Sequence, residues 1–145
     1  MARFFGRYEH SLDAKGRVIL PARFRAELGT RAFLSKHNER CLALWTPEEF
    51  DKKLAEMELL QETGRAERNL ARVWAAGSAE VEIDRQGRLA IPATMREFAR
   101  LEGDVLVMGA INRVELWDPP LWSEQVEPSE RQLTEEEDTP NTPQD

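Results

Sequence analysis

The sequence predicts an α+β fold, mainly β, built from two copies of one supersecondary unit. Residues 12–22 (LDAKGRVILPA) return as residues 83–93 (IDRQGRLAIPA), 71 positions further along the chain. The Leu-Trp-x-Pro at 44–47 returns at 116–119, with one inserted residue between the two matches. Each copy has only about 45 residues, too few to bury a sufficient core alone. We therefore expect the two copies to share one core around an internal pseudo-two-fold axis.

The first unit, residues 5–47, is predicted to form a strand, a turn, a second strand, a helix and a closing hairpin. Pro21 suits the first turn of a helix, and Gly29 suits its end. Branched apolar residues on either side of the turn favour strands. In chain order, the expected elements are a strand at 8–12, a turn at 14–16, a strand at 18–20, a helix between Pro21 and Gly29, and hairpin strands at 32–34 and 41–45.

The second unit, residues 79–122, repeats this order, with strands at 81–84 and 88–91, a helix at 93–100, and hairpin strands at 105–108 and 113–117. Residues 48–78 are predicted to form a helical connector. Thr46 is a capping residue followed by Pro47, and Thr63-Gly64 divides the connector into two helices, the second ending at Gly77. Apolar residues at helical spacing predict a face for the core or for a subunit interface. They are Phe50, Leu54, Met57, Leu60, Leu70, Val73 and Trp74.

The net charge of −7 is unevenly distributed along the chain. Residues 123–145 form an acidic segment with eight acids against Arg131 alone, so residues 1–122 are neutral overall. Residues 1–40 carry nine Lys or Arg against four acids. The composition from about residue 127 cannot bury enough apolar area to order itself, which predicts a flexible tail. The acidic total therefore does not exclude a nucleic-acid partner for the first unit.

The recurring turn, Asp-x-x-Gly-Arg, carries the candidate functional residues. Asp13 and Asp84 can accept hydrogen bonds from the turn that follows them, as Asx turns do. Gly16 and Gly87 supply the positive φ that lets the chain reverse. The arginine then comes back beside the aspartate, within reach of an ion pair. A well-made structural turn with an orienting ion pair is the alternative interpretation.

Arginines at both turn tips favour nucleic-acid binding. A guanidinium offers a rigid fork of donors that suits a phosphate or the edge of guanine. We expect Arg17 and Arg88 to be the leading DNA contacts, with the more basic first copy dominating. Auxiliary contacts to phosphate or bases are expected from Lys15, Arg85, Arg3 and Arg7.

Residues 3–25 (RFFGRYEHSLDAKGRVILPARFR) resemble the N-terminal signature of the MraZ family. The second Asp84-x-x-Gly87-Arg88 matches that family's second motif, and the Leu-Trp-Pro endings match as well. The resemblance covers residues 1–122. It implies two SpoVT/AbrB-like swapped-hairpin units that form an intramolecular pseudo-dimeric, double-psi-like barrel, and a ring-shaped homo-oligomer. It also implies a bacterial transcriptional regulator that binds short direct repeats in double-stranded DNA upstream of its own division and cell-wall gene cluster. The family's DNA-contacting Asp-x-x-x-Arg motif carries over to Asp13 and Arg17, and to Asp84 and Arg88.

The sequence gives little support for metal binding, catalysis or membrane insertion. His10 and His37 have no second ligand at a metal-binding spacing, so no metal or cofactor is expected. Cys41 lies in an apolar strand and has no paired base, so no catalytic residue is expected either. No apolar run is long enough to span a membrane or to act as a signal peptide, which predicts a cytoplasmic protein. The expected DNA binding adds association with the nucleoid. An oligomeric scaffold that recruits a protein partner remains the alternative function.

Overall fold

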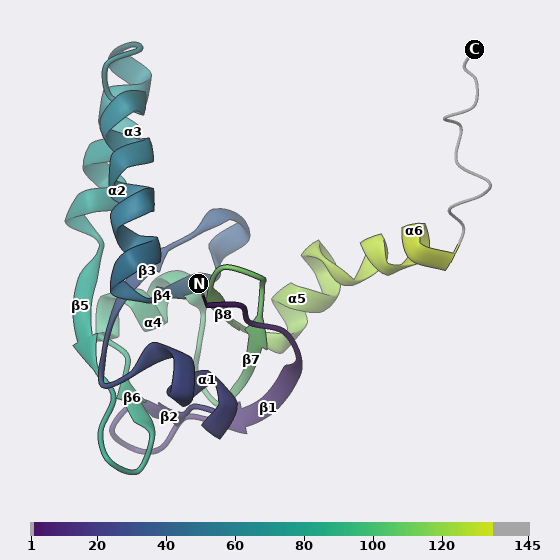
Figure 1. Cartoon of the computed structure of the whole chain (residues 1–145). Coiled ribbons are helices and arrows are strands. Elements are labelled where there is room, and N and C mark those ends of the chain that lie inside the picture. The colour runs from purple at the N-terminus through teal and green to yellow at the C-terminus, as the bar shows by residue number, and fades with distance from the viewer. Residues whose placement is uncertain (1, 135–145) are drawn as a thin grey trace.

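The computed structural model describes residues 2–134 as an antiparallel six-stranded sheet, a separate two-stranded ribbon and surrounding helices (Figure 1). The strands of the sheet, in spatial order, are β1 (Arg7–Ser11), β7 (Asp104–Gly109), β8 (Val114–Trp117), β4 (Leu42–Trp45), β3 (Arg31–Lys36) and β5 (Ala79–Glu82). The ribbon pairs β2 (Arg17–Ile19) with β6 (Arg88–Ala90). The helices are α1 (Ala22–Leu28), α2 (Pro47–Leu60), α3 (Arg65–Ala76), α4 (Ala93–Ala99), α5 (Pro119–Gln125) and α6 (Arg131–Thr134), with 3-10 turns η1 (Asn38–Arg40) and η2 (Glu127–Glu130).

The two sequence units interlock by exchanging strands. Strand β1 of the first unit pairs with β7 of the second, and β5 of the second pairs with β3 of the first. Strands β4 and β8, one from each unit, pair at the centre of the sheet, and β2 pairs with β6. The strand order is therefore symmetric: β1 and β5, the corresponding strands of the two units, lie at the two edges, with β7 and β3 next and β8 and β4 at the centre. The predicted combination of helices and antiparallel strands in a doubled unit is confirmed, but the fold is not mainly β, because the α-helices of residues 2–134 contain more residues than the strands.

Strand pairing does not close the sheet into a barrel in residues 2–134. Strands β1 and β5 are its two edges, and the β2–β6 ribbon is a separate sheet. Apart from the ribbon's own pairs, β6 joins the other elements through one isolated bridge, between Ile83 and Leu89. The barrel geometry that the resemblance implies therefore stays a prediction.

The main core lies where the ribbon and the sheet face each other. Val18 and Leu89 are in register on the ribbon, and both side chains are fully buried. Leu20 and Ile91, which directly follow β2 and β6, are buried in the same cluster. Since the side chains of a strand alternate between its two faces, the residues beside Val18 and Leu89 point outward.

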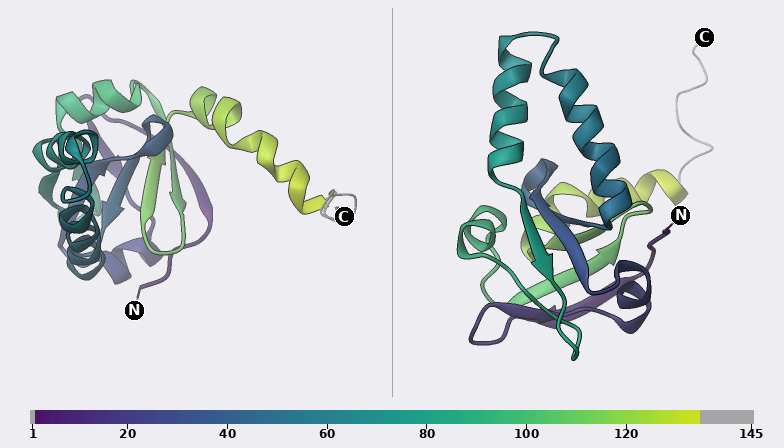
Figure 2. Two further views of the ribbon diagram at one scale, coloured as in Figure 1. Left: turned by 90° about the horizontal axis from the view of Figure 1, so that it is seen from above. Right: turned by 60° about the vertical axis from the view of Figure 1, so that its left-hand side comes forward.

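Helices α2 and α3 form a hairpin that projects from the body, at the end opposite the β2–β6 turns (Figures 1 and 2). The predicted start of α2 is confirmed, because the Thr46 hydroxyl accepts a hydrogen bond from the Glu49 N–H at 3.2 Å. Inside the hairpin, Trp74 stacks on Phe50 with their ring centroids 5.4 Å apart.

The predicted apolar face of this hairpin is only partly buried. Phe50, Met57 and Trp74 are buried, whereas Leu54, Leu70 and Val73 are 42%, 57% and 63% exposed. Burial does not follow the distance from the body, since Met57 is buried although it lies farther along α2 than Leu54. The buried side chains belong to one cluster in which α2, α3 and β4 pack together, and Leu54, Leu70 and Val73 lie outside it.

The C-terminal part of the described chain is helical where the composition predicted a flexible segment. Helix α5 crosses the boundary predicted at residue 122, and η2 and α6 continue as exposed helical turns to Thr134. Residues 135–145 of the predicted tail lie outside the described part. No helix in residues 2–134 is long and apolar enough to cross a membrane.

Candidate nucleic-acid interface

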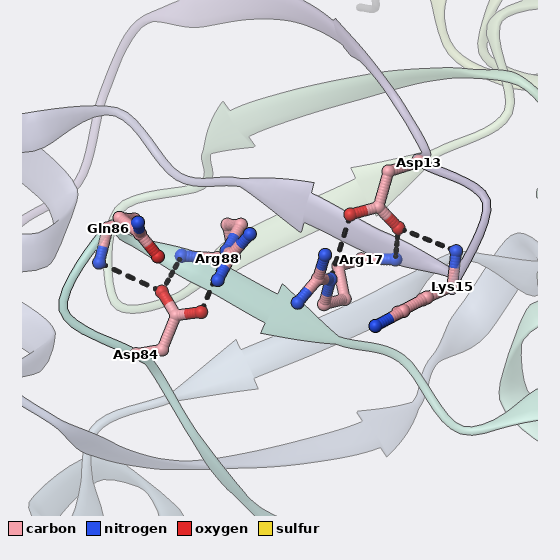
Figure 3. Close-up of polar contacts among 6 residues, drawn as sticks. All are labelled: Asp13, Lys15, Arg17, Asp84, Gln86 and Arg88. Atoms are coloured by element: carbon pink, nitrogen blue, oxygen red, sulfur yellow. Dashed lines mark hydrogen bonds and ion pairs between the residues drawn. The ribbon is translucent and has the colours of Figure 1, made fainter.

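The first turn is held by the carboxylate of Asp13. Its Oδ1 accepts hydrogen bonds from the backbone N–H groups of Lys15 and Arg17, both at 2.9 Å. Its Oδ2 accepts from Nε of Arg17 at 2.8 Å (Figure 3). The backbone N–H of Gly16 closes the turn on the Asp13 carbonyl at 3.0 Å, with φ of 76° at the glycine. The hydrogen bond from the Arg17 backbone is the main reason why the pKa of the Asp13 carboxyl lies below its ordinary value.

The second turn repeats this geometry. Asp84 Oδ1 accepts from the N–H groups of Gln86 and Arg88 at 3.0 and 2.8 Å, and Oδ2 accepts from Nε of Arg88 at 2.8 Å. Gly87 has φ of 82°. The backbone hydrogen bond from Arg88 lowers the pKa of the Asp84 carboxyl in the same way. Both predicted turns, with their aspartate–arginine pairs, are present.

The two turns are joined into a single surface by the ribbon. Arg17 lies opposite Ala90, and Ile19 lies opposite Arg88. Because Val18 and Leu89 point into the core, these four residues share the outer face, and Figure 3 shows both arginines on it. Arg17 and Arg88 are therefore diagonal neighbours, although they are 71 positions apart in sequence.

The arginines keep their outer nitrogens available. Each uses Nε for its aspartate, and no hydrogen bond from Nη1 or Nη2 of either side chain is present within residues 2–134. The side chains of Arg17 and Arg88 are 25% and 31% exposed. An oriented guanidinium with two unused donor groups suits a bidentate acceptor, such as guanine or a phosphate.

The structure places only some of the auxiliary candidates at the turns. Lys15 and Arg85 lie within the turns and are exposed. Arg7 begins β1 and forms an ion pair with Glu9 at 3.8 Å, roughly 20 Å of extended chain away from Asp13. Arg3 precedes the bridge between Phe4 and Ile111 and is also away from the turns in sequence. A contact between DNA and any of these side chains remains a prediction.

Two residues beside the turns were not singled out by the sequence interpretation. Arg96 of α4 packs against Gly16, and Arg25 of α1 packs against Gly87. Each arginine thus contacts the turn of the other unit. Their recurrence at the repeat offset was visible in the sequence, but the partner of each was not.

Comparison with known proteins agrees with the doubled motif. A model of the family described as "MraZ protein, putative antitoxin-like" matches residues 3–73 and 75–141. A protein of Thermoanaerobacter pseudethanolicus named transcriptional regulator MraZ is 46% identical over 119 residues, which cover 82% of this chain and 83% of that protein.

The chain belongs to the MraZ family. Proteins with the same name from Acetivibrio thermocellus and Halothermothrix orenii are 45% identical over 119 residues and 36% identical over 132 residues. The latter match covers 91% of this chain and 92% of that protein.

Other candidate residues of this MraZ-family chain lie away from the turns. Cys41 is buried, and burial raises the pKa of its thiol, so the side chain is in its neutral, unreactive form. Burial also lowers the pKa of His37, which favours the uncharged ring. Within residues 2–134, no three His, Cys, Asp or Glu side chains gather into a group that could hold a metal ion.

Proposed function

We propose that the chain is a sequence-specific DNA-binding transcriptional regulator. The observation that carries this proposal is the exposed antiparallel ribbon, with Arg17 and Arg88 on its outer face. The major groove of B-DNA admits a two-stranded β-ribbon, and arginine is the side chain that most often recognises guanine there. The relatives' name, transcriptional regulator, supports the same function.

The spacing of the two arginines suits neighbouring base pairs in one groove. Diagonal neighbours on an antiparallel pair have side chains roughly 7–8 Å apart. Two base-pair steps of about 3.4 Å cover nearly the same distance. The ribbon can therefore present both guanidinium groups to one short DNA element, while Asp13 and Asp84 fix their direction.

The finer parts of the proposal rest on the family resemblance. They are short direct repeats in the promoter of the chain's own division and cell-wall gene cluster, a ring-shaped homo-oligomer, and a cytoplasmic, nucleoid-associated location. The exchange of strands between the units supports the pseudo-dimeric, barrel-like arrangement. A regulator of this kind acts by binding, so we propose no catalytic activity.

Fluorescence anisotropy tests the proposal directly. The probes are a labelled duplex that carries the region upstream of the chain's own gene and a scrambled duplex of equal length and composition. We expect Arg17→Ala and Arg88→Ala each to weaken binding to the first duplex by about 1–3 kcal/mol, which is roughly 5- to 150-fold.

A salt series separates the two kinds of contact. Loss of a phosphate contact lowers the slope of log affinity against log salt by about 0.9, whereas loss of a base contact narrows the preference for the upstream duplex. Arg68→Ala is the matched control, because it removes an exposed arginine from α3, in the hairpin opposite the turns. Equal affinities for the parent chain, Arg17→Ala and Arg88→Ala would contradict the proposal.

The exposed apolar residues of the α2–α3 hairpin favour a second candidate function, an oligomeric scaffold for a protein partner. Leu59, Leu70 and Val73 are each more than half exposed. Scaffold function predicts that Leu70→Ser and Val73→Ser change assembly in analytical ultracentrifugation, while the parent chain shows no salt-dependent DNA binding.

A further inference from the structure

Each of the two turns packs against an arginine of the opposite unit. A side chain on Gly16 would collide with the guanidinium of Arg96. A Cβ on Gly87 would lie 2.6 Å from Nε and Cζ of Arg25. Both glycines are buried, although the residues that precede them, Lys15 and Gln86, are exposed. Each guanidinium therefore occupies the space that a side chain on the glycine would need.

Hydrogen bonds connect Arg96 to the first turn through the end of a ribbon strand, whereas Arg25 contacts the second turn by packing. Nη1 of Arg96 donates to the carbonyl of Ile91 at 2.5 Å, and the N–H of Ile91 donates to the carbonyl of Gly16 at 3.0 Å. In the other half, the N–H of Leu20 donates to the carbonyl of Gly87 at 2.9 Å. Arg96, the end of β6 and the first turn thus form one connected structure.

Neither arginine pairs with a carboxylate of the described residues. No ion pair of Arg25 or Arg96 within 4.0 Å is present in residues 2–134, and Nε of Arg25 is buried there without a hydrogen-bond partner. Both side chains are half-buried, so each guanidinium loses part of its hydration without gaining an ion pair within residues 2–134. Each guanidinium packs instead against the glycine that directly precedes Arg17 or Arg88.

We infer that Arg96 and Arg25 are positioning residues of the DNA interface and that they act crosswise. Arg96 holds the first turn and so sets the direction of Arg17, whereas Arg25 holds the second turn and sets Arg88. This inference rests on the proposed function, since it assumes that the turns contact DNA. It also explains why each copy carries both a turn glycine and an arginine nine residues later. The glycine leaves room for the arginine of the other copy, and the arginine of the same copy supports the other copy's turn.

Hydrogen exchange of the free protein tests the crosswise arrangement without DNA. The amides of Gly16 and Arg17 are both hydrogen-bonded to Asp13, so their exchange reports on the first turn. We expect Arg96→Ala to speed the exchange of these two amides by about tenfold or more and to leave Gly87 and Arg88 unchanged. Arg25→Ala should have the reverse effect. Faster exchange in the turn of the variant's own unit, or in both turns equally, would overturn the inference.

DNA binding by double variants tests the functional part. We expect Arg96→Ala to weaken binding to the upstream duplex by about tenfold with an unchanged salt slope, because Arg96 does not contact phosphate. Its effect should be coupled to that of Arg17→Ala and additive with that of Arg88→Ala. Additivity with Arg17→Ala, or a slope lowered by about 0.9, would overturn the positioning role.

The conservative variant Arg96→Lys separates position from charge. Lysine keeps the charge but not the planar fork, so it should restore less than half of the lost affinity on a logarithmic scale. Complete restoration of the affinity would show that charge alone acts, and would overturn the inference.

Thermal unfolding identifies any variant that does not fold. Arg25→Ala, for which the reverse pattern is expected, then serves as the independent test. If Arg17→Ala binds the upstream duplex as tightly as the parent chain, the proposed function is wrong. If Arg17→Ala weakens binding but the Arg96 and Arg25 variants bind as tightly as the parent chain, only the inference is wrong.

Discussion

Replacing Asp13 with asparagine separates the orientation of Arg17 from its presence. The amide oxygen of asparagine can still accept from the N–H groups of Lys15 and Arg17, as Oδ1 does now. The amide NH2 takes the place of Oδ2 and faces Nε of Arg17, so a charge-assisted hydrogen bond of 2.8 Å becomes an unfavourable contact between two donors. Arg17 keeps its charge but loses its fixed direction.

The structure sets the expected magnitudes. The lost ion pair is partly exposed, at 25% for Arg17 and 38% for Asp13, so its removal should lower the free energy of unfolding only slightly. Fixing a free arginine side chain on binding costs about 0.5–1.5 kcal/mol, which predicts a roughly 2- to 10-fold weaker interaction with the upstream duplex. The scrambled duplex should bind at least as well as before, because a negative charge near the phosphates is removed.

The assay is anisotropy with both duplexes, accompanied by thermal unfolding, with Asp51→Asn on α2 as the matched control for the charge. Asp51 is exposed and lies on the hairpin opposite the turns. The ratio of affinities for the two duplexes should fall for Asp13→Asn and stay constant for Asp51→Asn. An unchanged ratio for Asp13→Asn would refute the idea that the aspartate orients Arg17 for recognition.

Three further predictions concern single groups. The lowered pKa values of Asp13 and Asp84 mean that their contribution to stability is complete above the ordinary value of 3.8 and is lost as the pH falls through the folded-state pKa; carboxyl NMR titration should place both midpoints below 3.8. Gly16→Ala should lower the free energy of unfolding by about 1–3 kcal/mol because of its positive φ and the packed guanidinium, whereas Gly103→Ala, with nothing within 4 Å of a new Cβ, should change it by less than about 0.5 kcal/mol in urea titrations. The Cys41 thiol, 1% exposed and with a raised pKa, should resist iodoacetamide at about pH 8 in the folded protein and react in urea; rapid labelling without urea would contradict its burial.

Local features of the fold were predictable because neighbouring residues determine them. The Asp-x-x-Gly-Arg turn is defined by hydrogen bonds between positions 13 and 17 and by the φ of Gly16, all within five residues. The start of α2 follows from Thr46 and Pro47 in the same way. Such features depend on residue type and spacing alone, so each copy of the sequence specifies them independently.

The partners of the apolar residues were less predictable. The stripe along α2 and α3 predicts one buried face, yet Leu70 and Val73 are exposed while Trp74 is buried. Periodicity shows that a helix has an apolar face, but it does not show how far the rest of the molecule covers that face.

The sequence by itself determined that this protein has two copies of one unit, each with a glycine turn that fixes an arginine against an aspartate. Only the tertiary structure decided that β2 pairs with β6, that Arg17 and Arg88 therefore share one outer face, and that Arg96 and Arg25 support each other's turns. The physical reason is the separation in sequence between the residues that interact. A turn closes over a few residues, whereas strand exchange joins segments about 70 positions apart, and the pairing there is selected by the core that the two copies can bury only together.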